Sequence, residues 1–294
     1  MKEGAFTTME IQNMKQQSFS FEFFPPRTEK GIENLTKVRN TLAELNPAFF
    51  SVTYGAGGST QDSTFKTVLD SQKETGIPTA PHLSCVGSSR KHIRQILLDY
   101  KENDINRIVA LRGDLPSGMQ DIGDFKYANE LVEFIRQETG DYFQIEVAAY
   151  PEMHPQAVNY QTDIKNFSRK INAGANQAIT QYFYNADAYF YFIDSLAKAG
   201  IEIPVIPGVM PITNFVNLAR FSDGTGAEIP RWLRKRLEGY GDDVNAIQDL
   251  GFEFITKMCE QLLKGGAPGL HFYSMNKVEP SMAIWNALNL SLRK

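Results

Sequence analysis

The feature of this sequence that most constrains its fold is a regular alternation of short apolar segments with amphipathic ones. Eight apolar segments have the length and composition of buried strands, at a spacing of about 30 residues over most of the chain. Parallel strands need crossover connections of roughly a dozen or more residues, so the alternation predicts a parallel sheet. The expected strands cover residues 19–25, 49–56, 79–85, 107–113, 144–151, 177–184, 204–211 and 269–276.

The segments between these strands have the periodicity of helices. Apolar residues recur there at three- and four-residue spacing, which indicates one buried face. The expected helices cover residues 32–45, 62–75, 89–101, 125–139, 157–173, 188–199 and 280–290, with an enlarged helical region at 215–264. Eight strands with helices between them predict an α/β fold, a single (β/α)8 TIM barrel. An open doubly wound sheet is the alternative, although it usually has fewer strands.

No linker, low-complexity tract or internal repeat marks a second domain in the 294 residues. We therefore expect residues 1–294 to form one barrel, with residues 1–17 as a loosely ordered N-terminal segment. The formal net charge of −4 gives no electrostatic case for nucleic-acid or membrane partners. The only cysteines, Cys85 and Cys259, fit a reducing compartment, and no segment has the length and apolar character of a signal peptide or membrane span. These features predict a cytoplasmic protein.

Polar residues occur where the expected strands end, and active sites of barrels lie at the carboxyl ends of their strands. A polar side chain embedded in an apolar strand costs folding free energy unless it is paired or used. The concentration of polar side chains at one rim of the barrel therefore indicates a functional site. The rim residues are Glu22, Thr53, Tyr54, His82, Arg112, Asp114, Tyr150, Glu152, His154, Gln181, His271 and Tyr273.

Glu22 is the sharpest candidate for catalysis, because it lies between Phe21 and Phe23. Desolvation by aromatic neighbours should raise its pKa towards the range of a general acid. A Glu that pairs with a cation across the barrel, or that faces water, is the alternative. His82 and His154 can also be read as hydrogen-bonded rim histidines, and we expect His271 to be structural.

Other chemistries have weaker support. The expected strands contain no lysine, so a Schiff-base enzyme has no obvious nucleophile except Lys277. The cysteines and histidines lack metal-ligand spacing, so we predict no metal site. A metal-dependent lyase or hydrolase that assembles Glu22, His82, Asp114 and His154 remains the alternative function.

Eight segments, in order along nearly the whole chain, resemble the methylenetetrahydrofolate reductase family of the short, bacterial type. Collinear matches of this number are more specific than any single motif. The matching segments are FEFFPPR (21–27), SVTYGA (51–56), APHLSC (80–85), IVALRGDLP (108–116), VAAYPEMHP (147–155), AGANQAITQYFY (173–184), PGVMPITNF (207–215) and HFYSMNK (271–277).

The resemblance implies a flavoenzyme on a (β/α)8 barrel. NAD(P)H would reduce bound FAD, and the reduced flavin would then convert 5,10-methylenetetrahydrofolate to 5-methyltetrahydrofolate. The resemblance also implies a homo-oligomer, and it leaves the choice between NADH and NADPH open. A folate-binding barrel without redox activity is a third hypothesis.

The resemblance also implies roles for individual residues. Glu22 matches the acid that assists opening of the folate ring, and Asp114 matches a carboxylate that tunes the flavin potential. Substrate-binding positions are Glu22, Gln181, Phe215, Tyr273 and Lys277. Relatives commonly have Arg where this chain has Lys277, and Lys lacks the bidentate fork for a carboxylate. Positions that match the FAD site are Thr53, His82, Leu111, Arg112, Gly113, Asp114, Tyr150, His154, Ala157, Asp163, Asn166 and Lys170.

Overall fold

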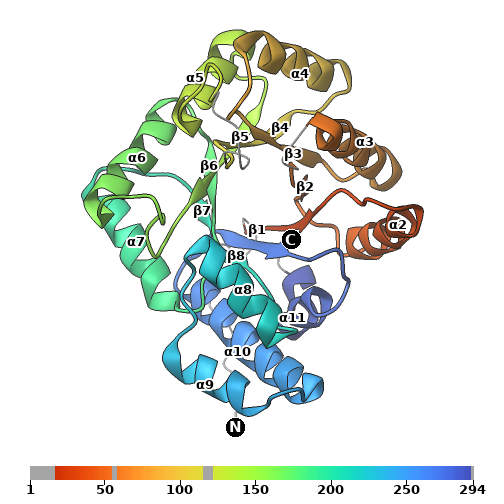
Figure 1. Ribbon diagram of the computed structural model, residues 1–294, viewed down its shortest axis with the longest axis vertical. Helices are drawn as coiled ribbons and strands as arrows, with labels where there is room; N and C mark the ends of the chain where they lie inside the picture. The colour runs from red at the N-terminus through yellow and green to blue at the C-terminus, as the bar shows by residue number, and fades with distance from the viewer. Residues whose placement is uncertain (1–16, 55–57, 115–121, 293–294) are drawn as a thin grey trace.

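The computed structural model describes residues 17–54, 58–114 and 122–292, which form a parallel barrel surrounded by helices (Figure 1). The sheet order is β7-β6-β5-β4-β3-β2-β1-β9-β8, and every pairing is parallel. The strands are β1 (Ser18–Phe23), β2 (Phe49–Val52), β3 (Thr79–Ser84), β4 (Arg107–Leu111), β5 (Gln144–Ala149), β6 (Gln177–Thr180), β7 (Val205–Ile206), β8 (Gly208–Val209) and β9 (Gly269–Tyr273). The predicted (β/α)8 barrel is confirmed.

The expected strand at residues 204–211 is divided in the structure. Its halves, β7 and β8, flank Pro207, which has no backbone N–H to donate to a neighbouring strand. Before Pro207 the chain pairs with β6, and after it the chain pairs with β9. The interrupted segment therefore closes the barrel as a seventh strand.

The helices lie outside the ring of strands, and most begin at a side-chain cap. Thr28 accepts a hydrogen bond from the amide of Gly31, and Asn159 accepts one from Thr162, so each satisfies an amide that the helix leaves unpaired. The enlarged region at 215–264 consists of three helices. The helices are α2 (Glu29–Ala43), α3 (Gly58–Thr75), α4 (Arg90–Glu102), α5 (Ala128–Thr139), α6 (Tyr160–Asn172), α7 (Ala186–Lys198), α8 (Phe215–Thr225), α9 (Arg231–Gly239), α10 (Val244–Lys264), α11 (Ser281–Ala287) and the 3-10 turn η1 (Leu290–Leu292).

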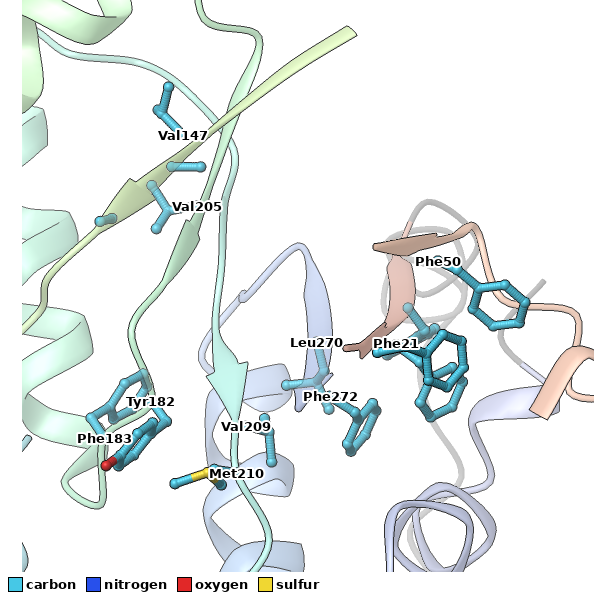
Figure 2. Close-up of a cluster of buried hydrophobic side chains, with 14 of the residues drawn as sticks. Phe21, Phe50, Val147, Tyr182, Phe183, Val205, Val209, Met210, Leu270 and Phe272 are labelled. Carbon is cyan, nitrogen blue, oxygen red and sulfur yellow. The ribbon is translucent and has the colours of Figure 1, made fainter. Parts of the chain in front are cut away.

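Side chains alternate between the two sides of each strand, and this separates the core into two parts. On the outer side, Phe21 stacks on Phe272 and on Trp285 of α11, with ring centroids 5.4 Å apart in each pair. Figure 2 shows Phe21 and Phe272 side by side, with Phe50 of the neighbouring strand close to them. A smaller cluster consists of Phe49, Ala80, Val109, Ile179 and Ile206.

An ion pair lies near the amino ends of β4 and β5. Glu146 is fully buried, and its Oε1 accepts from Nη1 of Arg107. The Arg107 guanidinium also lies 4.4 Å from the centroid of the Phe49 ring. Burial raises the pKa of Glu146 to about 7, although Arg107 opposes the shift. This end of the barrel therefore contains a carboxyl group that titrates near neutral pH.

The expectation of loose order for residues 1–17 concerns residues that lie outside the described part of the chain, except for Gln17. Among the described residues, no helix combines the length and apolar character needed to cross a membrane.

Candidate active site

The carboxyl ends of the strands surround a cavity of about 300 Å³. Two of its lining residues, Val109 and Ile179, belong to the smaller apolar cluster, so that cluster lies beneath the cavity. Polar residues from β1, β3, β6 and β9 and their ends line the same space, as expected at the C-terminal face of a barrel. The predicted site residues that line it are Glu22, His82, Leu111, Tyr150, Gln181 and Tyr273.

Glu22 is held between two imidazoles. Its Oε2 lies 3.2 Å from Nε2 of His82 and 3.7 Å from Nε2 of His271. The side chain of Glu22 retains 16% of its exposure, while that of His271 retains none. β1 lies between β2 and β9 in the sheet, and β3 follows β2, which explains how these residues meet.

The expected rise in the pKa of Glu22 is wrong. Burial does raise it, but the nearby imidazoles of His271 and His82 outweigh burial and lower the pKa to about 2. The expectation relied on Phe21 and Phe23, which are neighbours in sequence but point to the other side of the strand. Glu22 is therefore a carboxylate at neutral pH.

His271 has a defined orientation. Its Nδ1 lies 2.7 Å from Oγ of Ser20, and its Nε2 lies 3.5 Å from Oγ of Ser51 and faces Glu22. A carboxylate only accepts hydrogen bonds, so we place the proton on Nε2 and let Nδ1 accept from the Ser20 hydroxyl. Burial lowers the pKa of His271, which keeps the ring neutral. His271 thus faces the carboxylate of Glu22, whereas the sequence analysis predicted only a structural role for it.

His82 presents a nitrogen to the same carboxylate. Its Nε2 is buried and makes no hydrogen bond to any described residue, because the 3.2 Å approach of Glu22 is poorly aligned. His82 also lines the cavity. A buried nitrogen in this position is available to a ligand.

Tyr273 and Gln181 both line the cavity, and each is fixed by a hydrogen bond. The Tyr273 hydroxyl donates to the carbonyl of Thr180 at 2.7 Å. Gly208 permits this approach, because a Cβ there would lie 2.7 Å from the Tyr273 ring. Oε1 of Gln181 accepts from the amide of Tyr182 at 3.0 Å. The side-chain NH2 of Gln181, which has no partner among the described residues, is free to donate to a ligand.

The predicted residues that directly follow β4 form a charged edge beyond the cavity. Arg112 Nη2 lies 3.9 Å from Oδ1 of Asp114, whose side chain is fully exposed. Nε of Arg112 donates to the carbonyl of Gly113 at 3.1 Å. Gly113 has a φ of +81°, and a Cβ there would lie 2.9 Å from that of Ser84. This position therefore requires glycine.

A second group of predicted residues lies around the end of β5 and α6. Oδ2 of Asp163 accepts from the amide of His154 at 2.8 Å, which ties the loop after β5 to α6. Nζ of Lys170 donates to the carbonyl of Ala148. Burial lowers the pKa of Lys170 to about 8, and Asp163 opposes the shift. The Tyr150 ring lies edge-on to that of His154, with centroids 4.4 Å apart. Thr53, Ala157 and Asn166 were also predicted and, like these α6 residues, do not line the cavity.

Helix α8 supplies residues that the sequence did not point to. Phe221 and Thr225, one turn apart, line the cavity together with Tyr182, Met210 and Met275. Oγ1 of Thr225 donates to the Tyr182 hydroxyl at 3.1 Å, so α8 is tied to the end of β6. The four-residue spacing of Phe221 and Thr225 was a usable signal, because it places both on one helical face.

Two predicted substrate residues lie outside this cavity. Phe215 begins α8, and its ring centroid is 6.0 Å from the guanidinium of Arg234 on α9. Lys277 lines a different groove, between α2 and the segment after β9. The structure therefore places Phe221, rather than Phe215, beside the other cavity residues.

The alternative of a metal-dependent enzyme lacks its ligand set. Among the described residues, no group of three or more His, Cys, Asp or Glu side chains is arranged to hold a metal ion. Asp114 is fully exposed and pairs only loosely with Arg112. The four proposed ligands do not form one cluster.

A family model and relatives of known name match nearly the whole chain. The family model described as "Methylenetetrahydrofolate reductase" matches residues 7–289. The chain is 41% identical to 5,10-methylenetetrahydrofolate reductase of Salmonella typhimurium over 277 residues, which cover 94% of this chain and 92% of that protein. It is 40% identical to the enzyme of the same name from Escherichia coli, with the same coverage.

Proteins with lower sequence identity also match the chain, one in sequence and one in fold. "Methylenetetrahydrofolate reductase (NADH) 1" of Arabidopsis thaliana is 37% identical over 96% of this chain and 50% of that protein. A solved structure from Clostridium thermocellum, described as binding two copies of 5-methyl-5,6,7,8-tetrahydrofolic acid, superposes with a TM-score of 0.65. It is 19% identical and covers 96% of this chain and 98% of that one, so it supports the fold alone. From the family match and these relatives, the chain belongs to the methylenetetrahydrofolate reductase family and is an oxidoreductase.

Proposed function

We propose that the chain reduces 5,10-methylenetetrahydrofolate to 5-methyltetrahydrofolate in two half-reactions, with FAD as the electron carrier and NADH or NADPH as the donor. Family membership supports the reduction of methylenetetrahydrofolate. The name of the Arabidopsis relative favours NADH as the donor. The observation that carries the proposal is the Glu22 carboxylate, which faces the cavity between two imidazoles.

The polar residues beside the cavity fit a flavin with a diphosphate arm. Arg112 and Lys170 supply cations, and the buried Nε2 of His82 makes no hydrogen bond to a described residue. Thr53, Tyr150 and His154 add groups that can hydrogen-bond to the ring system or its ribityl chain. We propose that these residues hold FAD together with the backbone at Leu111, Gly113 and Ala157 and the side chains of Asp114, Asp163 and Asn166. Bound there, FAD would accept a hydride from the nicotinamide and pass one to the folate.

We propose that Glu22 donates the proton that the folate half-reaction needs. Opening of the folate's five-membered ring requires protonation of a ring nitrogen, which generates an electrophilic iminium cation. Glu22 lines the cavity and can carry a proton to a ligand there. Because its pKa is lowered to about 2, Glu22 must first take up a proton. His82 and His271 are the neighbouring groups that can relay it.

The same cluster can also stabilise the cation after the ring opens. An unprotonated Glu22 places negative charge beside the cavity, where solvent is largely excluded and charge interactions are strong. Gln181 is proposed to orient the pterin, because its free NH2 can donate to an acceptor on the ring edge. Tyr273, whose hydroxyl donates to the carbonyl of Thr180, would form part of the same wall.

Purified protein provides a direct test. We expect it to have the yellow absorbance of an oxidised flavin, to lose that absorbance on anaerobic addition of NADH, and to recover it on addition of methylenetetrahydrofolate. Protein that is colourless, cannot be reconstituted with FAD and contains stoichiometric metal would support the metal-dependent alternative. If NADH reduces the flavin but methylenetetrahydrofolate does not reoxidise it, the electron acceptor is a different substrate.

A further inference from the structure

Helix α8 forms part of the cavity wall but has little apolar packing of its own. Two of its 11 residues, Leu218 and Ser222, are buried, whereas the longer α10 buries eight. Phe221 and Thr225 of α8 line the cavity, so a shift of the helix would change the shape of the wall. Packing of an apolar face is what usually fixes a helix on its neighbours. The position of α8 therefore depends strongly on polar contacts.

Tyr182, which follows β6, makes such contacts with its hydroxyl. The side chain is 5% exposed and lines the cavity. Its hydroxyl accepts from Oγ1 of Thr225 at 3.1 Å and lies 3.3 Å from Oγ of the buried Ser222, to which it can donate. Ser222 and Thr225 are three positions apart, so both lie on the face of α8 that meets Tyr182. One phenolic oxygen thus joins the last turn of α8 to the end of β6.

The backbone of Tyr182 holds a second cavity residue. Its amide donates to Oε1 of Gln181 at 3.0 Å, and this bond directs the side-chain amide of Gln181. Oγ1 of Thr225, which contacts the Tyr182 hydroxyl, also lies 3.0 Å from the carbonyl of Phe221. Tyr182 therefore connects the polar group that faces the cavity with the aromatic ring that lines it.

The segment just beyond α8 is fixed separately, against the loop after β5. Oε2 of Glu152 accepts from the amide of Glu228 at 2.9 Å. Gly226 caps α8 with a φ of +75°, and a Cβ there would lie 2.8 Å from Cγ of Pro155. With this end of the helix held in place, the hydroxyl of Tyr182 determines how the preceding turn of α8 faces the cavity.

We propose that Tyr182 is a positioning residue that acts through Phe221, because its hydroxyl holds α8 where the Phe221 ring can pack on a bound folate. The inference rests on the proposed function, which supplies the folate as the ligand. A flat, aromatic pterin is recognised by rings that are already in place. If α8 were free to shift, part of the binding free energy would be spent on ordering it. The hydroxyl thus contributes to affinity by preorganising the wall.

Equilibrium binding of 5-methyltetrahydrofolate tests this role without requiring turnover. Tyr182→Phe removes the hydroxyl and keeps the ring and the backbone bond to Gln181. A net hydrogen bond corresponds to a factor of about two to ten in an equilibrium constant. The dissociation constant, measured calorimetrically on the full chain as isolated, should rise by about that factor. Ser222→Ala breaks the contact from the helix side and should have the same effect. The control Tyr189→Phe removes a buried hydroxyl that donates to the carbonyl of Val205 outside the cavity, and it should leave the affinity unchanged.

The action through Phe221 has a readout of its own. In a chain with Phe221→Ala the Tyr182 hydroxyl has no ring to position, so adding Tyr182→Phe should raise the dissociation constant no further. In turnover, most of the loss caused by Tyr182→Phe should appear in KM rather than in kcat, because preorganisation of the wall strengthens binding.

Unchanged affinity in both Tyr182→Phe and Ser222→Ala would overturn the proposal. An equal loss from Tyr182→Phe with and without the Phe221 ring would also overturn it, because the hydroxyl would then act elsewhere. A chain that binds the folate and shows the expected dependence, yet has no reductase activity, would support the role of Tyr182 and contradict the proposed reaction.

Discussion

Two carboxylates inside the barrel, Glu22 and Glu146, are shifted in opposite directions. Glu22 lies at the carboxyl ends of the strands, and its pKa is lowered to about 2. Glu146 lies near the amino ends of β4 and β5, and burial raises its pKa to about 7. Both have a basic side chain close by, so the presence of a partner does not determine the direction.

The arrangement of donors explains the difference. Two imidazoles converge on Oε2 of Glu22, and the side chain keeps some contact with solvent. At Glu146 one oxygen faces Arg107, the other makes no well-formed hydrogen bond to a described residue, and the side chain is fully buried. An unpaired buried oxygen disfavours the charged form. The barrel therefore keeps a carboxylate at its mouth and a group that is easily protonated at its base.

The largest effect should come from Glu22→Gln, because the substitution removes the carboxylate at the mouth of the barrel and leaves a side chain of nearly the same shape. We expect folate reduction to fall by about 10²–10⁴-fold, because general acid catalysis contributes roughly that factor. Reduction of the flavin by NADH should remain nearly unchanged. Stopped-flow measurement of the two half-reactions separates these outcomes. Equal losses in both would show that Glu22 is structural.

Glu146→Gln is the same substitution at the base of the barrel, and it should alter stability rather than catalysis. Between its ordinary pKa of 4.5 and about 7, folded Glu146 binds a proton that the unfolded chain does not bind. Stability is therefore lost as pH rises through this range, by up to about 3 kcal/mol. Urea unfolding measures the free energy of unfolding at about pH 5 and pH 8. Between these pH values it should decrease less in the variant than in the unsubstituted chain. Identical pH dependence in both proteins would contradict the raised pKa.

His271→Asn tests what lowers the pKa of Glu22. Without the ring that faces the carboxylate, the pKa of Glu22 should rise, and folate reduction should extend to higher pH. Loss of the buried hydrogen bond with Ser20 should cost about 1–3 kcal/mol of stability. Ser20→Ala is the matched control, because it removes that bond and retains the ring. A lower rate with an unshifted pH profile would limit His271 to a structural role.

The comparison also shows what could be predicted from the sequence. Strand ends and helix faces depend on local periodicity, so the barrel and much of its polar rim could be predicted. The environment of Glu22 could not, because His82 and His271 reach it only through the order of the sheet. Its adjacent phenylalanines misled the pKa argument because side chains alternate along a strand. Phe221 was missed although its spacing from Thr225 places both on one helical face, because only the packing of α8 shows that this face lines the cavity.

Asp114→Asn should have the smallest effect and extends the comparison to a carboxylate outside the barrel. The Asp114 side chain is fully exposed and lies 3.9 Å from Arg112, so solvent screens much of its charge. If Asp114 lies beside the proposed flavin, its loss removes negative charge that disfavours the reduced, anionic form. The flavin potential should then rise and folate reduction should slow a few-fold. Spectroelectrochemical titration measures the potential, with Asp70→Asn on α3 as a control that removes the same charge elsewhere. An unchanged potential would show that charge at this edge does not act on the cofactor, and that Glu22 is the carboxylate that matters to the chemistry.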